Sequence, residues 1–213
     1  MLRIFRERRL WARVVLCVLV GMLALGLIGS TIAWYLEPGQ RAPGSSPRPD
    51  RDEPGSQTEE DQLKALYAEY ETMLAASPDD LAVLTGSARV AAELGYFYFQ
   101  EGKQVEGREF YQRAVAHYEG VLARQEEPGI RLELAEAYQA LGSFEQAEQE
   151  LQTVLEKDPG NVQAQVQRGL LREAWQDWSG AAEIWEALAQ EQADLAVREF
   201  AQARLEMVRE KLK

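Results

Sequence analysis

Few residues of this 213-residue sequence have the type and spacing that a catalytic or metal site requires. His117 is the one histidine and Cys17 the one cysteine, so a cysteine-based zinc site and an internal disulfide are excluded, and a Ser-His-Asp triad would depend on His117 alone. Carboxylates are abundant, but a pair such as Glu145 and Glu148 is typical of a solvated helix face. We expect no enzyme, no catalytic residue, no cofactor and no metal, and a surface position for His117.

The elements that must carry these residues are predicted to be helices. Ala, Leu, Glu, Gln and Arg dominate the sequence, and all five are good helix formers. After the N-terminal segment, no run of β-branched residues alternates with polar ones, so we expect an all-α fold without a sheet. Trp175, Trp178 and Trp185 fall at helical spacing, which favours packing between neighbouring helices over a ligand cage.

Charge is distributed unevenly along the chain. The net charge is −12, but residues 1–57 hold eight arginines and five acidic residues, so about −15 belongs to residues 58–213. A domain this acidic repels phosphate backbones and anionic lipid surfaces. We therefore expect no nucleic-acid partner.

The N-terminal 36 residues have the pattern of a membrane anchor. Residues 1–13 are basic, and residues 14–36 form an uncharged run long enough to cross a bilayer. Because the arginines precede this run, we expect a single-pass signal-anchor with a cytoplasmic N-terminus and residues 37–213 outside the cytoplasm. A cleaved signal peptide is the competing interpretation, although the run is long for one.

Residues 37–57 are rich in Pro, Gly and Ser and nearly lack apolar side chains, so they cannot contribute to a packed core. We interpret them as a disordered linker. A helix is expected over residues 58–76, opened by a capping box from Ser56 to Glu59.

The most informative stretch runs from Pro128 to Asn161 and reads as two amphipathic helices joined by a turn. Gly142 follows the first apolar stripe, where a left-handed helix cap favours glycine. The sequence Asp158-Pro159-Gly160 ends the second helix. These signals predict one antiparallel helix pair.

The stretch resembles a tetratricopeptide repeat, a 34-residue helix–turn–helix unit. The small and large positions of that family are matched by Leu134, Ala135, Tyr138, Ala147, Leu151, Val154 and Pro159. Arg131 is a departure, because the family prefers Trp at this position. The resemblance implies an all-α, tetratricopeptide-like α-solenoid of antiparallel helix pairs.

Two flanking units resemble the same repeat. Residues 162–191 follow without a gap, although Arg168 and Arg172 stand where the family has Leu and Tyr. Residues 80–125 resemble one repeat with lengthened helices, with Gly107 where Ala is usual. A final helix over residues 193–213 is expected to cap the array, because an end repeat otherwise exposes its apolar face.

The family resemblance also implies a concave groove lined by the first helix of each pair. Its expected lining residues are Arg89, Tyr96, Leu132, Glu136, Gln139, Gln163, Val166, Leu170 and Glu173. Relatives that grip a C-terminal carboxylate use Lys, Arg and Asn at such positions, where this chain has Leu132, Glu136, Val166 and Leu170. We therefore expect no carboxylate clamp. The apolar strip suits a partner segment unless the last helix of the chain covers it.

The expected function is that of a membrane-anchored scaffold, displayed outside the cytoplasm, that binds a protein partner in this groove. The architecture is similar to bacterial membrane-anchored repeat proteins that assist envelope assembly. Two other interpretations stay open: a chaperone-like holder of exported proteins, and a self-assembling structural protein of the envelope that forms homo-oligomers.

Overall fold

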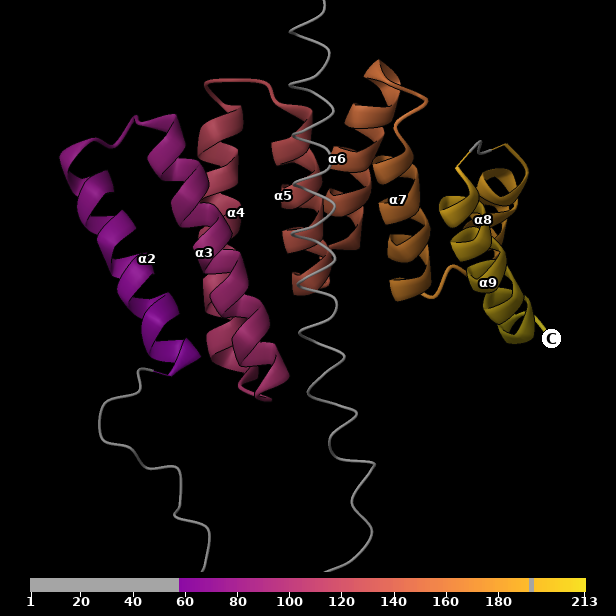
Figure 1. The fold of residues 1–213 in the computed structure, drawn as a ribbon, viewed down its shortest axis with the longest axis horizontal. Coiled ribbons are helices and arrows are strands. Elements are labelled where there is room, and N and C mark those ends of the chain that lie inside the picture. The colour runs from indigo at the N-terminus through magenta and orange to yellow at the C-terminus, as the bar shows by residue number, and fades with distance from the viewer. Residues whose placement is uncertain (1–57, 192–193) are drawn as a thin grey trace, which may run out of the picture. The chain divides into compact units, whose positions relative to one another are not determined.

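The computed structural model describes residues 58–191 and 194–213, and within these ranges the chain forms only helices and turns. The all-α prediction is therefore confirmed for this part of the chain. Figure 1 shows the helices following one another in chain order. They are α2 (Glu59–Ala76), α3 (Leu81–Gln100), α4 (Gln104–Leu122), α5 (Pro128–Leu141), α6 (Phe144–Lys157), α7 (Val162–Ala174), α8 (Trp178–Glu191) and α9 (Leu195–Lys211).

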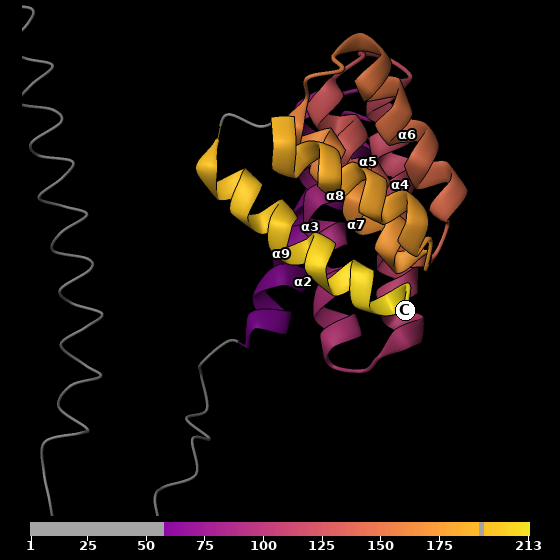
Figure 2. The same cartoon turned by 90° about the vertical axis from the view of Figure 1, so that its right-hand side faces the viewer.

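Successive helices pack as antiparallel pairs, α3 with α4, α5 with α6 and α7 with α8. Helices α3 and α4 have 20 and 19 residues, whereas α5 and α6 have 14 each, so the first pair is the longer one. Helix α2 packs on α3, and α9 packs on α8. Figure 2 shows α9 running beside α8.

The helix ends follow from specific residues. Gly142 has a φ of 78°, and its N–H donates to the carbonyl of Gln139, so α5 ends in the left-handed cap that the sequence predicted. The predicted capping box at Ser56–Glu59 is wrong by two residues. Thr58 caps α2 instead, because its hydroxyl accepts the backbone N–H of Asp61 and the Asp61 carboxylate accepts the N–H of Thr58.

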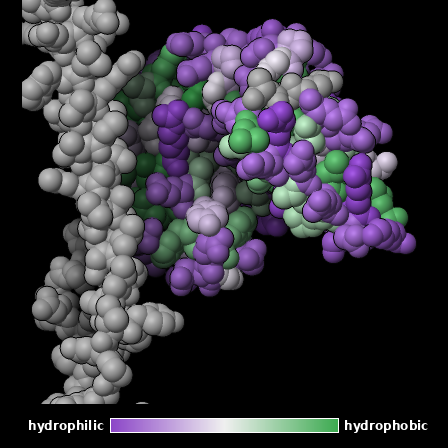
Figure 3. All heavy atoms as spheres, turned by 45° about the vertical axis from the view of Figure 1, so that its right-hand side comes forward, coloured by the Kyte–Doolittle hydropathy of each residue, from purple (hydrophilic) through white to green (hydrophobic). Residues whose placement is uncertain are grey.

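The buried side chains form three clusters along the array. The first lies between α2, α3, α4 and α5, the second between α5, α6 and α7, and the third between α7, α8 and α9. Trp185 is fully buried in the third cluster, and its ring meets Phe200 of α9 edge-on. On the face drawn in Figure 3, hydrophilic side chains cover most of the surface and hydrophobic ones appear in separate areas. The array is therefore held by interfaces between neighbouring helices.

Glycine allows two of these interfaces to form. A Cβ on Gly169 would lie 2.5 Å from the Trp185 ring. A Cβ on Gly107 would lie 2.3 Å from Cδ1 of Phe99 and 2.9 Å from the backbone oxygen of Gly95. Helices α3 and α4 thus approach more closely at Gly107 than an alanine there would permit.

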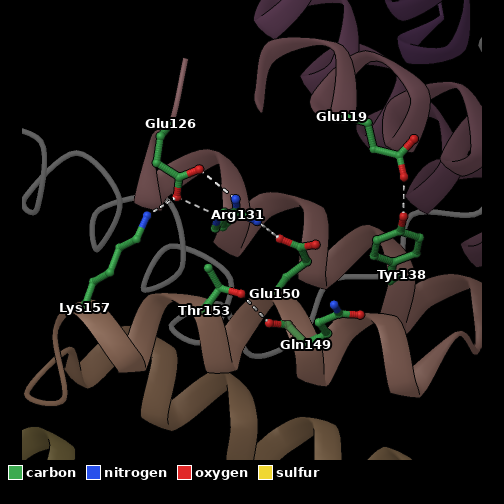
Figure 4. Close-up of polar contacts among 8 residues, drawn as sticks. All are labelled: Glu119, Glu126, Arg131, Tyr138, Gln149, Glu150, Thr153 and Lys157. Atoms are coloured by element: carbon green, nitrogen blue, oxygen red, sulfur yellow. Dashed lines mark hydrogen bonds and ion pairs between the residues drawn. The ribbon is translucent and has the colours of Figure 1, made fainter. Parts of the chain in front are cut away.

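Ion pairs replace apolar packing where the sequence departs from the repeat family. Arg131 pairs with Glu126 at 2.6 Å and also with Glu150, and Lys157 joins Glu126 at 2.7 Å (Figure 4). These contacts tie the start of α5 to α6. The arginine therefore occupies the position of the family's Trp as the centre of a charge network.

A second network explains Arg168 and Arg172. Both guanidinium groups of α7 contact one Glu148 oxygen of α6, at 2.6 and 2.7 Å. The Glu148 side chain is only 14% exposed, so the expectation that it belongs to a wet surface is wrong. A carboxylate between two guanidinium groups holds α6 against α7 here.

His117 also departs from its expected surface position. Its side chain is one-fifth exposed, and Nε2 lies 3.9 Å from the Glu71 carboxylate of α2. Nδ1 is buried and has no hydrogen-bond partner in the part of the chain that the structure describes. Burial lowers the pKa of this imidazole, an effect that Glu71 opposes and Arg113 reinforces. His117 therefore sits in the packing between α2 and α4 as a neutral side chain at pH 7.

Within residues 58–191 and 194–213, no helix combines the length and hydropathy needed to cross a bilayer. The expected basic N-terminus (1–13), membrane segment (14–36) and linker (37–57) all lie outside the described residues.

Candidate functional site

A hollow opens between α3, α4 and α5, and we call it the first hollow. Its lining consists of Arg89, Ala92, Tyr96, Tyr111, Tyr118, Glu133, Glu136 and Ala137. Three of the predicted groove residues therefore share one concavity. They are Arg89 and Tyr96 from α3 and Glu136 from α5.

The first hollow combines aromatic surface with carboxylates. Tyr96 is 58% exposed, while Tyr111 and Tyr118 are buried and form the base of the packing. Burial raises the pKa of Tyr111 to about 12, with a smaller contribution from the Glu136 charge, so its hydroxyl stays protonated. The rings offer π-faces and O–H donors rather than charge.

The charges of the first hollow are only partly balanced. Arg89 donates to both oxygens of Glu133, at 2.8 and 2.6 Å, which uses its guanidinium in a bidentate pair. Glu136 accepts a hydrogen bond from the Gln167 amide of α7, and it has no ion pair with a described residue. The surrounding protein removes water from the Glu136 carboxyl group and thereby raises its pKa, while the Gln167 bond lowers it and Glu133 adds to the rise. The hollow keeps one carboxylate that no cation of the described chain neutralises.

A second hollow lies farther along the array, between α5, α7, α8 and α9. Its lining consists of Gln139, Leu170, Glu173, Ala174, Trp178, Arg204, Met207, Val208 and Lys211. Gln139, Leu170 and Glu173 are predicted groove residues. The Glu173 carboxylate already has partners within the chain, because it accepts the Trp185 indole N–H at 2.7 Å and pairs with Arg204.

Helix α9 therefore forms one wall of the groove at its C-terminal end. Leu170 and Val166 pack against the third cluster, which includes Ala201, Leu205 and Val208 of α9. The sequence left open whether the last helix covers the apolar strip, and in this region α9 packs against it. Part of that apolar surface is covered by the chain itself.

Leu132 was also expected to line the groove, and this prediction is wrong. Its side chain is 4% exposed and belongs to the second buried cluster, so it is not available to a partner. Gln163 is exposed but lies outside the lining of both hollows. Counting positions along the family repeat assigned both residues to the groove. On α5, however, Leu132 faces the packed interior.

The sequence did not lead us to expect that α4 and α9 contribute to the two hollows. Tyr111 and Tyr118 of α4 line the first hollow, and Arg204 and Lys211 of α9 line the second. The seven-residue spacing of the two tyrosines, two helical turns, was a usable signal that they share a face of α4. Nothing in the sequence paired Arg204 with Glu173, which is 31 residues away.

Comparison with known families gives one match. Residues 110–170 match the tetratricopeptide repeat model. The match begins in α4, includes the whole α5–α6 pair and ends in α7, and it covers 61 of the 213 residues. It supports the repeat assignment made from the residues of Pro128–Asn161. No curated protein matches the chain.

Several solved structures are similar to the chain. The first tetratricopeptide domain of Spaghetti (RPAP3), bound to the HSP90 peptide SRMEEVD, is 26% identical over 60% of this chain and 97% of that one, with a TM-score of 0.40. The Sgt2 tetratricopeptide domain from Aspergillus fumigatus is 22% identical over 59% and 78%, with a TM-score of 0.43. The OM64 tetratricopeptide domain from Arabidopsis is 23% identical over 60% and 98%, with a TM-score of 0.37.

The described residues also bear on metal chemistry. Within residues 58–191 and 194–213, no group of three or more His, Cys, Asp or Glu side chains is arranged to hold a metal ion. The two hollows are lined by aromatic rings, apolar side chains, hydrogen-bond donors and carboxylates.

Proposed function

We propose that this chain is a protein-interaction scaffold of the tetratricopeptide type, which binds a segment of a protein partner in the first hollow. The observation that carries the proposal is the convergence of Arg89, Tyr96 and Glu136 from two first helices on one concavity. Tyr96 is a large aromatic side chain exposed at that point, and aromatic anchors of this kind are enriched in protein interfaces.

The proposal includes the location of the domain. The uncharged run at residues 14–36, preceded by five arginines, supports a single-pass anchor in a bacterial cell membrane with the helical array outside the cytoplasm. The linker at residues 37–57 would separate the array from the bilayer.

The electrostatics of the first hollow argue against a carboxylate-terminated partner. Arg89 is already paired with Glu133, and the remaining charge at Glu136 is negative. The acidic peptide that the Spaghetti domain binds would therefore meet repulsion here.

Co-purification tests the proposal. The full chain carries an affinity tag, and its partners are quantified by mass spectrometry for the wild type, for Tyr96→Ser and for the control Val105→Ser. Val105 is 68% exposed on α4 and lies outside both hollows, so its replacement removes an exposed apolar side chain elsewhere. We expect Tyr96→Ser alone to lose a defined partner. Equal recovery from all three chains would contradict binding in the first hollow, and a broad, unchanged set of exported proteins would favour the chaperone-like holder.

Topology is tested separately. The outer envelope of the cells is opened while the cell membrane stays intact, and a protease is then added. The protease should digest residues 58–213 and leave a tag at the N-terminus intact. Protection of the helical array from the protease would contradict its display outside the cytoplasm.

A further inference from the structure

The first hollow has the chemistry of a receptor for a cationic side chain. Its rim carries the exposed ring of Tyr96, and its lining carries Glu133 and Glu136. Arg89 neutralises Glu133, which leaves Glu136 as the unbalanced charge. An exposed aromatic face beside an unpaired carboxylate is the arrangement that attracts Lys or Arg.

The Glu136 carboxylate is held by a side chain of the following helix pair, Gln167 on α7. Gln167 is 9% exposed, and its amide nitrogen donates to the Glu136 carboxylate. Its Oε1 is buried and has no hydrogen-bond partner among the described residues. Because this oxygen is buried and Gln167 does not line the first hollow, a ligand there would meet Glu136 rather than the amide.

Glu136 of α5 therefore presents a carboxylate with unused acceptor capacity to the first hollow. The Gln167 bond engages one carboxylate oxygen of Glu136, so the other oxygen is available. Lysine has three N–H donors and arginine has five, and neither accepts hydrogen bonds. A cation is thus the side chain whose bonding pattern fits this carboxylate, which accepts hydrogen bonds and donates none.

We propose that the partner segment inserts one Lys or Arg side chain into the first hollow, where its cationic group meets Glu136 and the ring of Tyr96. The inference rests on the proposed function, because it names the chemistry of the segment that the groove accepts. Charge supports it at two scales. The hollow is acidic locally, and residues 58–213 carry about −15 in total, which steers a basic segment toward the domain.

The experiment is a peptide selection on the immobilised full chain in detergent micelles. The probe is a phage library of random twelve-residue peptides displayed with free C-termini, so that a carboxylate-terminated ligand can also be selected. We expect the enriched peptides to share a Lys or Arg at one fixed position. Enriched peptides without a fixed basic residue, or with a shared acidic C-terminus, would overturn the inference while leaving groove binding intact.

A double-mutant cycle then assigns the contact. The best peptide and its Lys→Met or Arg→Met version are titrated by fluorescence anisotropy against the wild type, Glu136→Gln and the control Glu199→Gln. Gln at position 136 can keep its hydrogen bond to Gln167, and Glu199 is an exposed acid on α9 outside both hollows, so Glu199→Gln removes the same charge elsewhere. We expect about tenfold weaker binding from the peptide change on the wild type, as for a charge-assisted hydrogen bond.

The cycle separates the possible results. On Glu136→Gln the peptide change should cost little further, whereas on Glu199→Gln the full loss should remain. An unchanged loss on Glu136→Gln would place the cation elsewhere and overturn the inference. If the library yields no binding peptide at all, the proposed groove function fails together with it.

Discussion

Replacing Gly107 by alanine tests the close approach of α3 and α4. Alanine is the residue that the repeat family favours at this position, and it favours a helix by about 1 kcal/mol over glycine. The structure predicts the opposite outcome. The added Cβ would lie 2.3 Å from the Phe99 ring and 2.9 Å from the backbone oxygen of Gly95, so α3 and α4 must separate.

The magnitude follows from two opposing effects. Forcing an extra methyl into a packed interface costs about 1–3 kcal/mol, and the upper part of this range applies because one of the contacted atoms is backbone. Subtracting the gain in helix propensity leaves a net loss of about 1–2 kcal/mol. For a domain of this size, such a loss lowers the melting temperature by about 2–8 °C.

Gly120→Ala is the matched control on the same helix. A Cβ there would meet no atom closer than 3.8 Å, so the substitution should raise stability by about 0.5–1 kcal/mol. Urea and thermal unfolding of the full chain, followed by circular dichroism at 222 nm, would compare the three proteins. If Gly107→Ala stabilises the protein as Gly120→Ala does, the close approach of α3 and α4 is wrong.

Three further predictions concern the packing between helices. Glu148→Gln should lower the unfolding free energy by about 1–2 kcal/mol because Arg168 and Arg172 lose their shared carboxylate; an unchanged urea midpoint would argue against that network. Leu151→Ala should cost about 3 kcal/mol, since this side chain is fully buried in the second cluster, and a loss below 1 kcal/mol in the same assay would contradict its burial. Because the folded-state pKa of His117 is depressed, its stabilising contribution is complete above the unfolded value of 6.5 and is lost as the pH falls through the lower folded value. The wild type should therefore lose more stability than His117→Gln on acidification below pH 6.5, and parallel pH profiles would refute this.

Much of the fold could be predicted because helical signals are local. The apolar spacing around Tyr138 and Leu151, the cap at Gly142 and the break at Asp158-Pro159-Gly160 each depend on a few neighbouring residues. The family match to residues 110–170 includes this stretch.

The groove was harder to predict because it depends on how helices rotate and where the chain returns. Leu132 has the position of a groove residue but turns into the core, and α9 covers part of the strip around Leu170. The pairing of Glu148 with Arg168 and Arg172 joins residues at least 20 positions apart, so spacing within one helix could not indicate it. Their departure from the family's apolar residues was the available signal, since two half-buried arginines require an acid nearby.

Binding of a partner in the first hollow is tested most directly by photo-crosslinking in cells. A photoreactive phenylalanine derivative is placed at position 96 and, for comparison, at position 105. Both sites are exposed, but only Tyr96 lines the first hollow. We expect one dominant adduct to another protein from position 96, joined to a partner segment that contains Lys or Arg, and no such adduct from position 105. The same adducts from both positions, or crosslinks from position 96 only within the chain itself, would contradict binding of a partner in the first hollow.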